Sequence, residues 1–347
     1  MDIKAPEVYQ IGNPWQKKVY SSMAAYLESF QEVKSYGVSR NGNVYKHLLT
    51  TDQSRLNFIN DEIYVATNER FAKHKAGDLN RILTNTAASQ PYCFNLIVYL
   101  QQHLYLADKL FSDLIGKQIS VKHLEPEFTP NQCDNIVNFE RTEDESLGDQ
   151  NPKLEIGTDA DIAVFYTFED NKKGVLLIEF KFIESEFSVC SSYSNKKDIQ
   201  STCDSGNFYK EFIEIKNSLC GYNRYKNWEL TEKSKVFNNA KIKTLSACPF
   251  RFGLNQLWRN MLLSEKVASS RKCDEFGFWV FSPIQNDKYL WKNNETESQF
   301  RSILTDQGNT HFKKVHLETL FDKLREIISK NTDKEWLDAM EKKYRIE

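Results

Sequence analysis

Two hydrophobic runs near the middle of the chain predict a pair of β-strands. Residues 161–168 alternate in polarity and are rich in β-branched and aromatic side chains. Residues 174–182 form a nearly continuous apolar run, which is typical of a strand buried on both faces. The polar residues 169–174 between them have the composition of a turn. The pattern therefore predicts two neighbouring strands near the centre of a sheet.

Further periodic segments surround this pair of strands. Apolar residues at three- and four-residue steps predict helices in the segments 15–30, 84–115 after Pro91, 249–266, 311–328 and 334–344. Residues 135–142 alternate and predict an earlier strand, and the apolar run 276–283, which ends at a proline, predicts a later one. Residues 184–243 are rich in Ser, Asn, Tyr and Lys and predict a long irregular region with a helix at 208–219.

Three charged residues interrupt the two central strands. Asp161 begins the first strand, and Glu179 and Lys181 lie in the second, where a spacing of two places them on one face. Buried charges are normally paired or bound to a metal, so neighbouring strands would bring Asp161 and Glu179 to a shared divalent cation. The lysine could then orient or deprotonate a water, or neutralise a phosphate. The alternative is an edge strand with a solvated ion pair, although the apolar flanks favour a central strand.

These residues resemble a known family. Asp161, a 17-residue gap and Glu179-Phe180-Lys181 are similar to the pattern of the PD-(D/E)XK nuclease superfamily. Within it, the chain resembles a bacterial group of predicted restriction-endonuclease-like proteins over roughly residues 85–265. This narrower resemblance rests on SQPYCFN (89–95), GTDAD (157–161), IEFKF followed by an acidic residue, and QLWRN (256–260).

The resemblance implies an α/β fold. Its expected form is a restriction-endonuclease-like αβββαβ core with a mixed central sheet, extended by N- and C-terminal helices. On this basis we expect an N-terminal helical region (1–120) packed on the core, the nuclease core (121–290) and a C-terminal helical extension (291–347).

The resemblance also implies an activity and its residues. It predicts a Mg²⁺-dependent endodeoxyribonuclease, with Mn²⁺ as a substitute, acting on double-stranded DNA in restriction or phage defence. Asp161 and Glu179 would bind the metal, Lys181 would assist the water, and Gln256 would orient water or phosphate or else be a surface residue. Additional candidates, each with an ordinary structural alternative such as helix capping or exposure, are Glu140 as a third carboxylate, Gln90, Asn95 and Arg259. Candidate DNA contacts, or else residues of an ordinary exposed loop, are Lys196, Lys197, Arg224 and Lys226.

Composition limits the remaining classes. The chain has 347 residues and a net charge of −2, so any nucleic-acid contact requires a local basic face. Seven cysteines without an N-terminal signal peptide predict reduced thiols and a cytoplasmic protein, and no apolar run is long enough for a membrane span. The spacings of Cys190, Cys203, Cys220 and Cys248 match no zinc or cluster pattern, which favours buried thiols. Phosphate-loop, GxSxG and HExxH motifs are absent from the sequence.

Two hypotheses of different classes follow. The first is the metal-dependent endonuclease, which would act as a homodimer because both DNA strands must be cut. The second is a catalytically inactive nuclease-fold protein that serves as a nucleic-acid-binding or assembly subunit. Metal-dependent cutting of DNA, and its loss on substitution of Asp161 or Lys181, distinguishes them.

Overall fold

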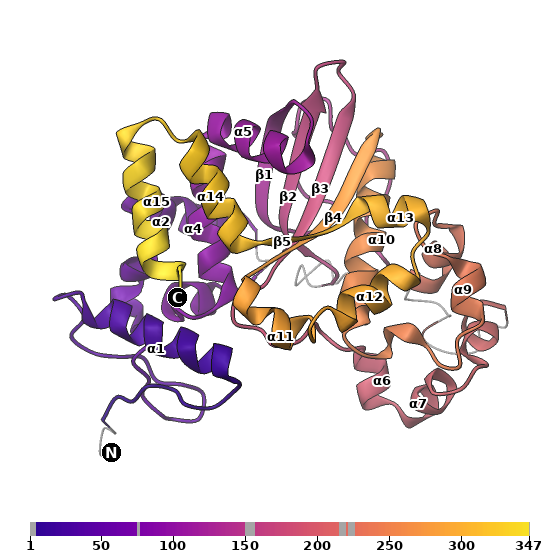
Figure 1. Cartoon of the computed structure of the whole chain (residues 1–347), viewed down its shortest axis with the longest axis horizontal. Coiled ribbons are helices and arrows are strands. Elements are labelled where there is room, and N and C mark those ends of the chain that lie inside the picture. Colours follow the sequence, from indigo (N-terminus) through magenta and orange to yellow (C-terminus); the bar gives the residue numbers. More distant parts are fainter. Residues whose placement is uncertain (1–4, 75–76, 150–156, 215–219, 221–225, 347) are drawn as a thin grey trace.

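A five-stranded mixed sheet forms the centre of the molecule (Figure 1). The computed structural model describes residues 5–74, 77–149, 157–214, 220 and 226–346. The strands lie side by side in chain order: β1 (Ile119–Phe128), β2 (Ala160–Phe168), β3 (Lys173–Phe180), β4 (Glu275–Ser282) and β5 (Phe312–His316). The first three strands are antiparallel, and β3, β4 and β5 are parallel. The predicted mixed α/β architecture is therefore confirmed.

The central strand pair is the predicted one. β2 pairs with β3 in the register Ile162↔Ile178, and Asn171 in the connecting turn has a positive φ of 62°. Side chains of β3 that point to opposite faces, such as Leu176 and Leu177, are equally buried. Helices cover both faces of the sheet, which explains why this strand is apolar along its whole length.

Helices from both ends of the chain cover one face of the sheet. The predicted helix 84–115 is two helices, α4 (Ser89–Gln102) and α5 (Leu104–Ile115), because His103 between them has a non-helical backbone. Both contact β1, and α14 (Leu317–Ile327) packs on α5. The remaining helices of this layer are α1 (Pro14–Glu28), α2 (Asp61–Lys73), α3 (Leu79–Thr84) and α15 (Asn331–Tyr344), with a short 3₁₀ helix at Thr51–Asn57.

The opposite face is covered mainly by α10 (Leu254–Ser270). This helix is the last element of the long connection between the parallel strands β3 and β4, and it packs on both of them. Shorter helices extend this layer around it, from the bottom centre to the right-hand side of Figure 1: α6 (Ser191–Asn195), α7 (Lys197–Cys203), α8 (Asn227–Lys233), α9 (Asn239–Lys243), α11 (Asp287–Leu290), α12 (Glu295–Ser302) and α13 (Asp306–His311). Residues 210–214 form one π-helical turn where a longer helix was predicted, and residues 215–219 lie outside the described part.

One strand prediction was wrong, and one predicted helix begins as a strand. Residues 135–142 form turns rather than a strand, and the first strand is β1 at Ile119–Phe128. β5 occupies the start of the segment predicted as helix 311–328, so a residue range beyond 290 contributes to the sheet. The alternation of β1 is hidden by a register shift between Val121 and His123, and β5 is only five residues long and leads directly into α14.

Side chains from the helical layer bond to the main chain of β1, which is an outer strand of the sheet. The Val121 main-chain N–H donates to Asp108 Oδ1 (2.6 Å), and Gln101 Nε2 donates to the Leu124 carbonyl (2.9 Å). Among the described residues, every helix lacks the combination of length and apolar composition that crossing a bilayer requires.

Candidate active site

Three carboxylates stand in a row across the first three strands. One step beyond the pair Ile162↔Ile178, the register of β2 and β3 sets Asp161 opposite Glu179. The β1 pairs Pro126↔Ile162 and Phe128↔Ala160 bracket Asp161 and set Glu127 opposite it on the other side. Asp161 Oδ2 also accepts a hydrogen bond from the main-chain N–H of Phe180 (2.6 Å). The sheet thus brings together the two acids on which the sequence prediction depended.

Glu179 is buried and fully engaged by polar side chains. Its Oε1 lies 2.8 Å from Lys181 Nζ and accepts a hydrogen bond from Gln256 Nε2 at 2.7 Å. Its Oε2 accepts from Asn260 Nδ2 at 2.5 Å. Gln256 and Asn260 are one turn apart on α10, so they reach the same carboxylate from the helix that follows β3. The position of Glu179 is therefore fixed from two elements.

Lys181 is the buried cation of the site. Its exposed fraction is 8%. Burial alone would lower the pKa of Lys181, but the carboxylates of Glu179, Glu184 and Asp161 outweigh burial and raise it above the ordinary value. Lys181 therefore carries a proton, and its ammonium group can donate hydrogen bonds to an anion.

The acidic groups repel one another. Burial raises the pKa of Asp161 well above its ordinary value, and the nearby Glu179 and Glu127 raise it further. Burial also raises the pKa of Glu127, although the hydrogen bond from Gln90 Nε2 (3.0 Å) and the charge of Arg70 oppose the shift. Converging carboxylates with raised pKa values are the donor set that a hard divalent cation with oxygen ligands binds. The residues of this row fit such a cation.

An open cavity of about 580 Å³ gives access to these residues. Asp161, Glu179 and Lys181 line it from the strands, and Gln256 lines it from α10. Ser89 and Gln90 reach it from the start of α4, and Arg81 reaches it from α3. Basic and neutral polar groups therefore surround the acids at the entrance.

Glu184 belongs to the same cavity. It accepts hydrogen bonds from the Ser89 hydroxyl (2.8 Å) and the Phe182 main-chain N–H (3.0 Å), and it lies 3.4 Å from Arg81. Burial would raise the pKa of Glu184, but Lys181 and these hydrogen bonds lower it overall. Glu184 therefore connects the strand end to α3 and α4.

Three of the additional candidate residues lie elsewhere. Glu140 is exposed near Lys173, at the opposite end of β3 from Glu179, so the structure does not bring it to the carboxylate row. Asn95 is buried in the helical layer, where it bonds to Asn57, Pro91 and Tyr344. Arg259 bonds to Thr158 (2.6 Å) and pairs with Asp149 (3.4 Å) rather than with the acids of the row.

The structure describes three of the four residues predicted to contact nucleic acid. Lys196 and Lys197 are exposed at the junction of α6 and α7, and Lys226 is exposed before α8. Arg224 lies outside the described residues.

The four mid-chain cysteines are free and form two pairs. A hydrogen bond from Cys220 lowers the pKa of Cys190 to about 6. The reduced thiols of Cys203 and Cys248 form a hydrogen bond with one another. Cys203 and Cys248 are buried, as expected, whereas Cys190 and Cys220 are partly exposed.

Sequence reasoning missed Glu127, Asn260 and the contacts of Glu184. Glu127 follows Pro126 in a strand that was not predicted, so no pattern pointed to it. Asn260 lies one helical turn after Gln256, and this i, i+4 spacing could have identified it. Glu184 was noticed only as the acidic residue that follows IEFKF.

The fold and the paired acids define a restriction-endonuclease-like protein. A family model described as the PD-(D/E)XK nuclease superfamily matches residues 15–346, nearly the whole chain. The chain therefore belongs to the PD-(D/E)XK nuclease superfamily, whose members are nucleases that generally use divalent metals. Searches of curated proteins and of solved structures found no match.

Proposed function

We propose that the protein is a Mg²⁺-dependent endodeoxyribonuclease that hydrolyses phosphodiester bonds of double-stranded DNA in restriction or phage defence. The observation that supports this proposal most strongly is the placement of Asp161 opposite Glu179, with Lys181 2.8 Å from Glu179 in an open cavity. Mn²⁺ is expected to replace Mg²⁺ because both cations accept oxygen ligands.

The residues of the cavity divide the work of such a reaction. Asp161 and Glu179 would hold the cation, with Glu127 as the third carboxylate of the row. In that position the cation would supply activation of a water and stabilisation of charge on the phosphate oxygens. The ammonium of Lys181 donates hydrogen bonds to the attacking water or to a phosphate oxygen. Gln256 and Asn260 position Glu179 through both of its oxygens.

The DNA backbone would approach from the open side of the cavity. Arg81 lies at its edge, and the exposed Lys196, Lys197 and Lys226 are the described basic residues that we propose for backbone contacts beyond it. Since a duplex has two strands to cut, we also propose that two copies act together. Light scattering of the protein on a short duplex measures this, and a mass of one chain per duplex would contradict it.

Cleavage of supercoiled plasmid DNA tests the proposed activity. We expect the wild type to nick or linearise the plasmid with Mg²⁺ or Mn²⁺ and to stop when the metal is chelated. Asp161→Asn and Lys181→Met should each reduce the rate at least about 100-fold, because each removes a group that stabilises the reacting phosphate or its cation.

Matched substitutions on the hairpin turn serve as controls. Asp170 and Lys172 are exposed and pair with one another, so Asp170→Asn and Lys172→Met should cut at the wild-type rate. If the wild type shifts DNA in a gel but does not cut it with any divalent metal, the nuclease hypothesis is wrong and the hypothesis of a non-catalytic nucleic-acid-binding subunit is favoured. If Asp161→Asn cuts as fast as the wild type, the assignment of the site is wrong.

A further inference from the structure

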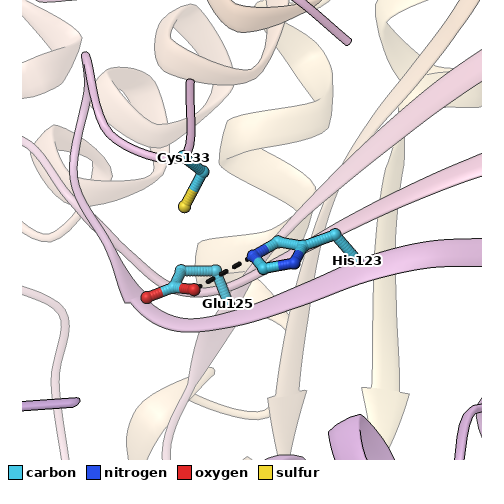
Figure 2. A group of neighbouring side chains, drawn as sticks. All are labelled: His123, Glu125 and Cys133. Atoms are coloured by element: carbon cyan, nitrogen blue, oxygen red, sulfur yellow. Dashed lines mark hydrogen bonds and ion pairs between the residues drawn. The ribbon is translucent and has the colours of Figure 1, made fainter. Parts of the chain in front are cut away.

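A second group of metal-ligand side chains lies on β1, outside the carboxylate row. His123 and Glu125 are two residues apart on the strand, and Cys133 approaches them from the loop that follows (Figure 2). His123 Nε2 is 3.0 Å from Glu125 Oε2, and the ligand atoms of all three residues lie within 4.8 Å of one another. A tetrahedral ion with bonds of about 2.0 to 2.3 Å requires ligand atoms roughly 3.3 to 3.8 Å apart. Small side-chain adjustments therefore suffice to close the site.

The chemistry of this group differs from that of the carboxylate row. A thiolate, an imidazole and a carboxylate are the ligand types of Zn²⁺, whereas Mg²⁺ selects oxygen ligands alone. Burial and the adjacent Glu125 raise the pKa of the Cys133 thiol, so an ion binds here with release of the thiol proton, and the resulting thiolate and the carboxylate together balance the charge of a dication. Arg70 lies 3.6 Å from the other oxygen of Glu125 and supplies the outer contact that commonly orients a metal-binding carboxylate.

The loop that carries Cys133 is held in place before any ion binds. The carbonyls of Gln132 and Cys133 accept hydrogen bonds from Arg271 (2.6 and 3.0 Å). Arg271 in turn forms a fully buried ion pair with Glu145 (2.6 Å), and Glu145 also accepts a hydrogen bond from the Asn131 main-chain N–H (3.0 Å). The main chain at Cys133 is therefore held by Arg271 at the end of α10, which lowers the ordering cost of ligand binding.

A cavity of about 1070 Å³ opens beside the three side chains. His123, Glu125 and Cys133 line it together with His74, Lys122 and Thr129. The hydroxyl of Thr129 is buried and has no hydrogen-bond partner among the described residues. The cavity leaves room for a water as fourth ligand.

We propose that His123, Glu125 and Cys133 bind one Zn²⁺ ion, with water as the fourth ligand. The ion joins the loop at residues 129–134 to β1, two residues before Glu127. Arg70 connects the two places, because it contacts Glu125 and also donates to the Glu127 main-chain carbonyl (2.6 Å). The proposed ion thus connects this loop to β1 beside the carboxylate row. It does not depend on the nuclease activity proposed above.

Metal analysis of the purified full chain tests the proposal. After reconstitution with Zn²⁺ and removal of free metal, we expect one zinc per chain by mass spectrometry. The Co²⁺-loaded protein should show a thiolate-to-cobalt charge-transfer absorption. Cys133→Ser and His123→Gln should weaken Zn²⁺ binding by at least about 10-fold, since each removes an inner ligand. Cys133→Ser should also abolish the charge-transfer absorption.

Two controls separate this site from other thiols and from the carboxylate row. Cys273→Ser removes a partly exposed thiol outside the group and should bind zinc as the wild type does. Asp161→Asn should retain one zinc even though it loses cleavage, so failure of one proposal is distinguishable from failure of the other. Absence of zinc from the reconstituted wild type would overturn the proposal, as would unchanged binding in folded Cys133→Ser or, should that variant not fold, in His123→Gln. Hydrogen bonding alone would then explain the group.

Discussion

Glu127 is the residue whose role depends most on tertiary structure. It stands opposite Asp161, accepts a hydrogen bond from Gln90 and has a positive φ of 52°, in a region that side chains other than glycine seldom adopt. Its exposed fraction is only 6%, and its pKa is raised. Burying a carboxyl group next to two others lowers the stability of the fold. Such a cost is expected where function requires the charge.

Replacing Glu127 with Gln tests whether it serves the metal. We expect Glu127→Gln to lower metal-dependent cleavage by about 10- to 100-fold and to raise the metal concentration needed for half-maximal cutting. The melting temperature without metal should not fall, because like-charge repulsion is relieved. Glu169→Gln, on the exposed hairpin turn, is the control and should change neither quantity. Full activity of Glu127→Gln would show that Glu127 does not contribute to the metal site.

His47 is a buried titratable residue outside the candidate active site. Its exposed fraction is 5%, its ring contacts those of Tyr20 and Tyr45, and its Nδ1 has no hydrogen-bond partner among the described residues. Burial lowers the pKa of His47 from its ordinary value to about 4. The unfolded chain therefore binds more protons than the folded chain between pH 6.5 and 4, and stability falls as the pH is lowered through that window.

His47→Phe should remove this dependence. We expect the free energy of unfolding of the wild type to drop by about 2 kcal/mol more than that of the variant between pH 7 and pH 5. Urea unfolding at the two pH values measures the difference. Carboxylates titrate in both proteins, so only the difference reports on His47. Equal losses in the two proteins would show that His47 titrates normally in the folded state.

At the scale of elements, α10 organises both candidate sites. Its first turns supply Gln256 and Asn260 to Glu179, and Arg271 at its end supports the Cys133 loop. The Arg271–Glu145 pair has no exposed side-chain surface, and Arg271 also bonds to the carbonyls of Gln132 and Phe139. Such a pair holds a loop in one position, but it leaves an uncompensated charge when one partner is removed.

Removing one partner of this pair should destabilise the protein strongly. Arg271→Met leaves the Glu145 carboxylate buried without its cation, and we expect a loss of about 3 to 5 kcal/mol in the free energy of unfolding. Lys233→Met breaks the exposed pair with Glu229 and should cost less than about 1 kcal/mol. Urea denaturation of the two variants and the wild type provides the comparison. Similar values for both substitutions would contradict the assigned burial.

The elements show what sequence patterns can and cannot predict. The β2–β3 pair follows from local periodicity, and with it the adjacency of Asp161 and Glu179, because a short turn fixes the pairing of two strands. The position of Gln256 near Glu179 could be predicted because its segment has the periodicity of the helix that follows β3. β1 was not predicted because a register shift breaks its alternation and Pro126 lowers its strand propensity. The row of three acids depends on how β1 aligns with β2 across a long connection, and local sequence does not determine that alignment.

At the scale of the whole molecule, the C-terminal helix α15 packs on α4 behind the candidate active site. The Tyr344 ring of α15 stacks on Tyr92 of α4, with ring centres 3.9 Å apart. Tyr92 in turn packs on Phe180 and Phe182, which flank Lys181. The C-terminal helix therefore supports the strand end that carries the candidate catalytic residues.

Two substitutions at Tyr344 separate packing from hydrogen bonding. Tyr344→Ala empties a buried aromatic position and should cost about 3 to 5 kcal/mol of unfolding free energy. Tyr344→Phe keeps the stacked ring and loses only the bond from Asn95 Nδ2 (2.9 Å), so about 1 kcal/mol is expected. Thermal and urea unfolding measure both. A small loss in Tyr344→Ala would show that α15 contributes little to the core.

The bonds from Asp108 and Gln101 to β1 limit how copies of the protein can associate. An outer strand with unsatisfied main-chain groups invites edge-to-edge pairing with another chain, and eventually aggregation. Here helix side chains already occupy such groups on β1, and β5 at the other edge carries Lys313 and Lys314. The two copies proposed to act together on DNA are therefore expected to contact one another through side-chain surfaces rather than through a continuous intermolecular sheet.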